Sequence, residues 1–225
     1  MDTVTESQER VVRKDVARNR ARLLAAADAL VAEQGLEISL NELARRAGVG
    51  VGTVYRHFVD KEAVLNALFE HRLDVVAEVF QEASERDDPI EGLRTAVFRL
   101  GELQAGDRAL FQVVAVTTSA AQRTAARKRL QPLATKLADR AKATGRMRPE
   151  FGPTDIPMLL WISMSMSEYG GAVRPDLWRR YIEVLLAGFA AEDEPHRALD
   201  VKALSPDDIE EAMAHWRESN RHSKD

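Results

Sequence analysis

The sequence predicts an all-α protein, with an amino-terminal three-helix domain of the helix-turn-helix type and a larger helical domain after it. Apolar residues recur mainly three and four positions apart, which is the spacing of one helix face, and no stretch alternates as a half-buried strand does. Hydrophobic residues make up 45% of the 225 residues, which is enough for a substantial core. We expect the first domain to span residues 1–60 and the second to span residues 61–225.

The composition excludes several kinds of chemistry. The chain contains no cysteine, so disulfides, zinc-thiolate sites and cysteine nucleophiles are excluded. Its first residues are polar and lack the apolar run of a signal peptide. No segment approaches the roughly twenty uninterrupted apolar residues of a membrane span. We therefore expect a cytoplasmic protein that does not contact a membrane.

The first helix is predicted over residues 14–34. One face carries Leu23, Ala27, Leu30 and Val31, at helical spacing. Gly35 follows, and glycine is the usual left-handed residue that ends a helix.

A second, short helix begins at Ser39, where SLNE has the pattern of a capping box. The Ser39 hydroxyl can accept from the Glu42 amide, while the Glu42 side chain reaches back to the amide of Ser39. Gly48 ends this helix because glycine adopts positive φ without a Cβ clash. The residues expected to face inward are Leu43, Ala44 and Ala47, with Val49 filling the corner.

A third helix is predicted from Gly50 to about Val59, before Asp60 caps a fourth helix that opens with Lys61 and Glu62. Val54 and Phe58, four positions apart, form its buried side. The opposite side carries Val51, Gly52, Tyr55 and Arg56.

Two helices joined by a short glycine-bearing turn form a helix-turn-helix, whose second helix fits the major groove of DNA. The charge distribution agrees with this interpretation. Bases strongly outnumber acids between Arg10 and Arg22, whereas residues 62–225 carry more acids than bases. Gly50 and Gly52 would keep the start of the third helix slim enough for close approach to DNA.

The stretch ISLNELARRAGVGVGTVYRHFVDKEAVLNALFEHR resembles the DNA-binding segment of the tetracycline-repressor (TetR) family of bacterial transcription regulators. The resemblance covers roughly residues 15–72 and rests on LARRAGV, GTVYRHF and DKEAVL, in that order and spacing. The remaining two thirds match only in pattern, as an acidic helical domain of the right length. The resemblance implies a homodimer on a palindromic double-stranded DNA operator, released when an unknown small-molecule effector binds the second domain.

The resemblance also implies roles for individual residues. Arg56 would be the strong hydrogen-bonding reader of a base, since arginine pairs bidentately with guanine, while Val51 and Tyr55 can pack on a thymine methyl group. The family often has serine where this chain has Gly50, and a larger or polar residue where it has Gly52. The complete set of implied DNA contacts is Arg13, Lys14, Arg18, Ser39, Arg45, Arg46, Val51, Gly52, Thr53, Tyr55, Arg56, His57 and Lys61.

After the fourth helix, helices are predicted over residues 90–104, 107–118, 120–144, 153–169 and 175–190, and a last one from Ser205. Two of them, DIPMLLWISMSMSEYG and DLWRRYIEVLLAGFAA, are unusually apolar. The resemblance implies that the last two long helices form a four-helix bundle across a dimer axis, although a plain intramolecular core explains the pattern too. The candidate interface residues are Trp178, Tyr181, Ile182, Leu185, Leu186 and Phe189.

A sparse set of aromatic and methionine side chains provides the candidates for an effector pocket. Methionine adapts to irregular ligands, although such residues at helical spacing are more often core. The candidate pocket residues are Phe98, Phe111, Met158, Trp161 and Met164.

Catalysis is not expected. The five histidines form no metal or acid–base arrangement, SMSMSEYGG lacks the glycines of a nucleophile elbow, and no phosphate-binding glycine loop precedes a lysine. We expect no cofactor and no metal. Besides a ligand-responsive repressor, two alternatives stay open at this stage: a ligand-independent DNA-binding or architectural protein, and a helical enzyme or interaction module that merely contains the motif.

Overall fold

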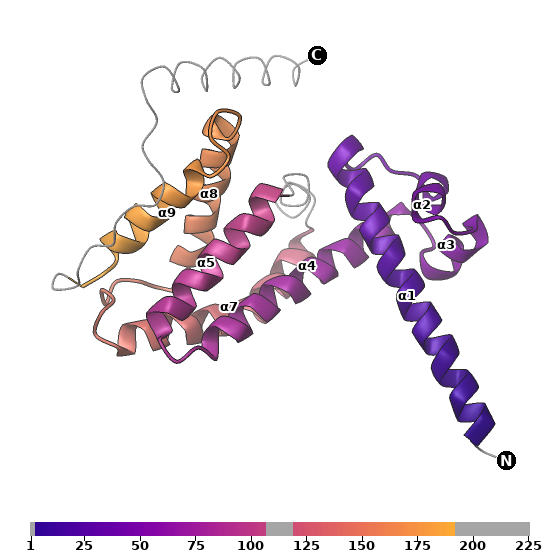
Figure 1. The fold of residues 1–225 in the computed structure, drawn as a ribbon, viewed down its shortest axis with the longest axis horizontal. Helices are drawn as coiled ribbons and strands as arrows, with labels where there is room; N and C mark the ends of the chain where they lie inside the picture. The colour runs from indigo at the N-terminus through magenta and orange to yellow at the C-terminus, as the bar shows by residue number, and fades with distance from the viewer. Residues whose placement is uncertain (1–2, 107–118, 192–225) are drawn as a thin grey trace. The chain divides into compact units, whose positions relative to one another are not determined.

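The structure is a computed structural model that describes residues 3–106 and 119–191, with side chains described from Arg18 onward except at positions 106, 120 and 123 (Figure 1). These residues form an all-α fold without a named strand; one isolated β-bridge joins Met147 and Ala190. The chain divides into two compact units after Arg72. Unit 1 comprises residues 3–72 of the described chain, and unit 2 comprises residues 73–106 and 119–191.

Unit 1 contains α1 (Thr3–Gln34), α2 (Leu40–Ala47), α3 (Val51–His57) and the first half of α4 (Lys61–Ser84). The predicted start of the first helix at residue 14 was wrong, because α1 begins at Thr3. Residues 3–13 contain neither glycine nor proline, so no backbone signal interrupts the helix there. The predicted end at Gln34 is confirmed, and Gly35 has the left-handed φ of 74°.

The predicted punctuation of α2, α3 and α4 is confirmed. Ser39 and Glu42 form the capping box, with the Glu42 amide donating to the Ser39 hydroxyl over 3.2 Å. Gly48 ends α2 with a φ of 64°. Asp60 caps α4, because the Ala63 amide donates to its carboxylate over 2.7 Å. These local bonds set the turns that orient α3.

The core of unit 1 joins α1, α2, α3 and the start of α4. Val64 and Leu68 of α4 are buried in it, so the compact unit extends to Arg72. The boundary at residue 60, as a functional division, stays a prediction. The buried residues of this core are Leu23, Ala26, Ala27, Leu30, Val31, Ile38, Leu43, Ala44, Ala47, Val54, Phe58, Val64 and Leu68.

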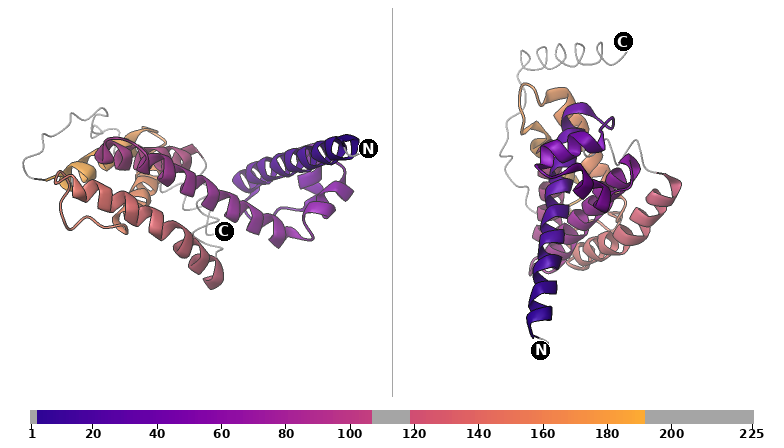
Figure 2. Two further views of the ribbon diagram at one scale, coloured as in Figure 1. Left: turned by 90° about the horizontal axis from the view of Figure 1, so that it is seen from below. Right: turned by 90° about the vertical axis from the view of Figure 1, so that its right-hand side faces the viewer.

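Unit 2 contains the second half of α4, α5 (Pro89–Gly106), α7 (Ala120–Ala143), α8 (Asp155–Gly170) and α9 (Leu177–Gly188). Helix α5 packs against α7, α8 and α9, and α8 packs against α9. The left view of Figure 2 shows the helices of unit 2 from a second side. The predicted helices agree with these to within a few residues at each end. The helices predicted over residues 107–118 and from Ser205 lie outside the described residues.

The α5–α9 contact is close because Gly101 has no side chain. A Cβ at Gly101 would overlap the ring of Trp178. Trp178 also packs on Phe98, with ring centroids 5.8 Å apart. One glycine thus lets a large aromatic residue lie against the α5 backbone, where it is 2% exposed.

Candidate nucleic-acid interface

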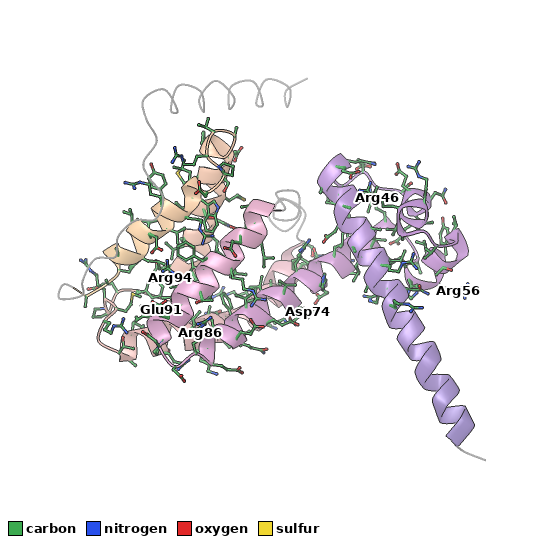
Figure 3. All side chains as sticks on the ribbon, viewed as in Figure 1. Arg46, Arg56, Asp74, Arg86, Glu91 and Arg94 are labelled. Carbon is green, nitrogen blue, oxygen red and sulfur yellow. The ribbon has the colours of Figure 1, made fainter. Side chains whose placement is uncertain are left out.

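Helix α3 separates its apolar and polar sides as predicted. Val54 and Phe58 are buried in unit 1, whereas Val51 is 41% exposed and Tyr55 is 54% exposed. Gly52 and Arg56 are exposed as well, and Arg56 lies on the outer side of α3 (Figure 3). Thr53 and His57 are half-buried at the edges of this face.

The start of α3 has open space around its backbone. Gly50 is the N-cap and supplies no side-chain hydrogen bond. A Cβ built on Gly50 or on Gly52 would meet no atom within 4 Å, and neither glycine has positive φ. The packing of unit 1 therefore does not require glycine at these positions. Their effect is to expose backbone amides at a helix start, where another molecule can approach closely.

Two of the predicted phosphate contacts are already paired with carboxylates. Arg46, in the last turn of α2, donates to Glu33 Oε2 over 2.7 Å and makes a second bond to Glu33 Oε1. The Arg46 hydrogen bond holds the pKa of the Glu33 carboxyl below its ordinary value, and Glu33 in turn raises the pKa of Arg46. The Lys61 Nζ lies 3.1 Å from Glu37 Oε2.

Some of the other basic side chains of unit 1 are exposed on its surface, and others contact neighbouring helices. Arg45 and Arg56 are exposed, and the Arg56 Nε donates to the Gly52 carbonyl over 3.3 Å. Arg20 stacks over the Phe58 ring at 5.5 Å, and Arg22 donates to the Ala47 carbonyl at the end of α2. Sequence reasoning had missed these two bracing roles, because they depend on which residues meet across α1.

The remaining predicted DNA contacts lie on α1 and at the N-cap of α2. Arg18 is exposed on α1. The side chains of Arg13 and Lys14 lie outside the described ones. Ser39 uses its hydroxyl within its own capping box, donating to Glu42 Oε2 over 2.9 Å. Arg45, the α3 face and Lys61 thus come together within one small unit, on α2, α3 and the start of α4.

The four predicted effector residues that the structure describes differ in burial. Phe98 is buried under Trp178, and the guanidinium groups of Arg94 and Arg179 stack on its ring. Met158 is 43% exposed and Trp161 is 57% exposed, because other residues of α8 occupy its inner side. Met164 is half-buried, and Phe111 lies outside the described residues.

The predicted interface residues also divide. Trp178 and Ile182 are buried within unit 2, where a second copy of the chain could not reach them. Leu185, Leu186 and Phe189 are half-buried and pack against the core. Tyr181, at 38%, is the most exposed of the six predicted residues. It belongs to a set on α8 and α9, here named the α8–α9 apolar surface: Met158, Trp161, Ile162, Tyr169, Tyr181 and Val184.

Two buried polar side chains of unit 2 were not anticipated. Gln104 on α5 is 3% exposed, and neither atom of its amide has a hydrogen-bond partner among the described residues. Within the same part of the chain, the hydroxyl of buried Ser163 on α8 has none either. A glutamine at an inward helical position, three residues after Gly101, is the sequence signal that would have identified the first of these.

Two surface grooves are found in unit 2. One of about 510 Å³ lies along α7 between Arg127 and Asp139, and one of about 310 Å³ lies between α4 and α5 around Arg86. Neither contains a predicted effector residue. Among the described residues, no three potential metal ligands cluster, and no helix has the length and hydropathy needed to cross a bilayer.

Comparisons with known proteins agree with this geometry. A family model described as bacterial regulatory proteins of the tetR family matches residues 23–68, which contain α2, α3 and their turn. An HTH-type transcriptional regulator of Staphylococcus aureus is 33% identical over 107 residues, which cover 46% of this chain and 57% of the relative. The match thus spans little more than half the length of that curated relative.

Solved structures extend the likeness to the whole fold. A TetR transcription regulatory protein from Mycobacterium vanbaalenii is 29% identical with a TM-score of 0.62, covering 80% of this chain and 99% of that one. FadR from Bacillus subtilis, solved with stearoyl-CoA, is 19% identical with a TM-score of 0.61, covering 75% and 98%, and shows the fold alone. The helix-turn-helix segment of unit 1 thus matches that of the TetR family of bacterial regulatory proteins, and the described chain shares the all-helical fold of a TetR regulator.

Proposed function

We propose that this protein is a transcriptional repressor that binds a palindromic operator as a homodimer and releases it when a small molecule binds. The observation that carries the proposal is the outer face of α3. It presents Val51, Tyr55 and Arg56 on a seven-residue helix whose glycine start leaves its backbone open. A B-DNA major groove admits one α-helix of this kind.

The contacts divide by chemistry. Arg56 would read guanine through two hydrogen bonds, and Val51 and Tyr55 would pack on thymine methyl groups. Gly52, Thr53 and His57 would complete this base-facing set. Phosphates would be held by cations and polar groups on both sides of α3, which position the helix without reading sequence. The proposed phosphate set is Arg13, Lys14, Arg18, Ser39, Arg45, Arg46 and Lys61.

Dimerisation would occur through the α8–α9 apolar surface. One recognition helix reads only a few base pairs, which is too little for useful selectivity in a genome, so two half-sites are needed. A group of exposed large apolar side chains is typical of a protein–protein interface. Trp161 and Tyr181 are the aromatic anchors that we expect at its centre.

The effector is proposed to bind within unit 2; the fold-related FadR was solved in complex with a small molecule, stearoyl-CoA. Phe98, Met164 and Gln104 are the candidates that stay on its inner side. The effector must bind more tightly to the conformation that cannot match both half-sites, since equal affinity for both conformations shifts nothing. Such a regulator acts where the chromosome is, so the proposal places it in the cytoplasm.

The DNA-binding proposal is tested by capturing fragmented genomic DNA on the purified protein and sequencing the bound fragments. We expect a palindromic motif, and Arg56→Ala should weaken binding to it by about 1–3 kcal/mol while binding to random duplex changes little. Arg127→Ala, on α7 of unit 2, is the matched control. Equal losses on both duplexes would reassign Arg56 to phosphate contact, and recovery of no motif would contradict the proposal.

A second candidate function is a ligand-independent DNA-binding or architectural protein. It is favoured by one observation: Phe98, a predicted effector residue, is buried against Trp178, as in a filled core. A thermal-shift screen of small apolar and amphipathic molecules, followed by operator binding with each hit, separates the two. A compound that stabilises the protein and lowers its operator affinity supports the repressor.

A further inference from the structure

One short segment of unit 1 forms ion pairs with two basic side chains, which lie on two different helices. Residues 33–37, here named the acidic turn, contain Glu33 in the last turn of α1 and Glu37 just beyond it. Gly35 lies between them with a φ of 74°, and reverses the chain direction. Glu33 pairs with Arg46 of α2, and Glu37 pairs with Lys61 of α4.

The two contacts differ in strength but have the same electrostatic effect. Arg46 contacts both carboxylate oxygens of Glu33, which is the two-pronged geometry that a guanidinium also uses for phosphate. Lys61 makes a single contact to Glu37, whose side chain is 89% exposed. Each carboxylate cancels one positive charge on the surface that would meet DNA.

Neither pair is needed to hold the fold. Both are solvent-exposed, and exposed ion pairs contribute little net stability because water and salt already screen them. The turn after α1 and the starts of α2 and α4 are stabilised by Gly35, by the capping box of Ser39 and by Asp60. By contrast, Arg45 and Arg56 have no carboxylate contact among the described residues. The acidic turn therefore pairs with Arg46 and Lys61, and not with Arg45 or Arg56.

We propose that the acidic turn competes with DNA phosphates for Arg46 and Lys61, and so lowers the affinity of this protein for every duplex. The inference rests on the proposed function. A phosphate oxygen seeks the same guanidinium and ammonium donors that the two carboxylates occupy, so each DNA contact must displace or share a carboxylate. Base readout by α3 is untouched. Weaker anchoring leaves the effector less binding free energy to overcome when it releases the operator.

Glu33→Gln and Glu37→Gln test the proposal in the full-length chain. Both keep the size and a hydrogen-bonding oxygen but remove the charge. Affinity for a random-sequence duplex is measured by fluorescence anisotropy over a salt series. We expect each variant to bind about 3- to 10-fold more tightly near 0.1 M salt, and the plot of log affinity against log salt to steepen by up to about 0.9 for each freed cation.

Two controls separate this effect from general charge. Glu78→Gln removes one negative charge from an exposed position of α4 in unit 2, so it reports the long-range contribution alone. Adding Arg46→Gln to Glu33→Gln should abolish the gain, because no cation is then freed. Thermal denaturation confirms that each variant is folded.

Each outcome of these binding measurements either supports or contradicts the proposal. Weaker binding by Glu33→Gln would mean that the carboxylate aims Arg46 at DNA, which overturns the proposal. Binding no tighter than that of Glu78→Gln would overturn it too, because Arg46 and Lys61 would then not contact phosphate. A wild-type chain that binds no duplex overturns the proposed function and this inference together, whereas duplex binding without the gain overturns the inference alone.

Discussion

Large apolar side chains are exposed in both units, but their surroundings differ. On α3, Val51 and Tyr55 stand beside glycines, Arg56 and other cations. On α8 and α9, six large apolar side chains are exposed, Trp161 and Tyr181 among them. A polar, cationic setting suits a polyanion with apolar methyl groups on its bases, and a group of exposed apolar side chains suits a second protein surface.

The exposure of an apolar side chain does not by itself identify what the surface binds. Trp161 and Trp178 have the same side chain and lie on two helices that pack together, yet one is 57% exposed and the other is 2% exposed. Both helices are apolar around more of their circumference than one core can cover. The residues left outside are therefore the candidates for an interface, and those inside hold the subunit together.

The largest expected effect separates the two tryptophans. Trp178→Ala should destabilise unit 2 by about 3–5 kcal/mol, because it removes a fully packed aromatic side chain and leaves a cavity beside Gly101. Trp161→Ala should leave the stability of the subunit nearly unchanged and weaken self-association. Chemical denaturation and sedimentation at several protein concentrations measure the two quantities. Equal losses of stability would remove the distinction between core and surface.

Two glycines provide the next contrast. Gly101→Ala should cost about 1–3 kcal/mol, because its Cβ would overlap the confined Trp178 ring. Gly52→Ala should stabilise α3 by roughly 0.5–1 kcal/mol, since alanine is the better helix former and has open space there. Thermal unfolding reports both changes. If Gly52→Ala also weakens DNA binding, close approach at this position is supported; unchanged binding would argue against it.

Gln104 provides a further test of how burial affects stability within unit 2. Gln104→Leu, of similar volume, should raise stability by about 1–2 kcal/mol, because a buried amide without partners carries a desolvation cost that leucine does not. Urea denaturation measures the change. Lower stability of the variant would show that the amide is satisfied in solution, by water or by a bound molecule.

The smallest expected effect is a loss of stability at low pH. Asp88 accepts a hydrogen bond from Arg146, and also caps α5 at Ile90, so the pKa of its carboxyl is lowered in the folded state. A lowered folded pKa contributes stability that is present above the unfolded value of about 3.9 and is lost as pH falls through the folded pKa. Asp88→Asn keeps a capping side chain and loses the charge. We expect a stability difference below about 1 kcal/mol at pH 7, since the pair is exposed, vanishing near pH 2.

Much of unit 1 could be predicted because its signals are local. The capping box at Ser39, the left-handed Gly48 and the Asp60 cap each depend on residues within four positions of one another. Helix boundaries in unit 2 were predicted within a few residues for the same reason. The start of α1 was missed because a helix continuing through polar residues leaves no signal where it begins.

Sequence by itself determined the helices, the turn between α2 and α3, and which side of α3 faces outward. Its period of 3.6 and its capping residues encode these through contacts one turn apart. Tertiary contacts alone place Trp178 inside and Trp161 outside, bury the amide of Gln104, and pair Glu33 and Glu37 with Arg46 and Lys61. Those outcomes depend on residues far apart in the chain, and an apolar helix carries no mark of which side its neighbours will cover.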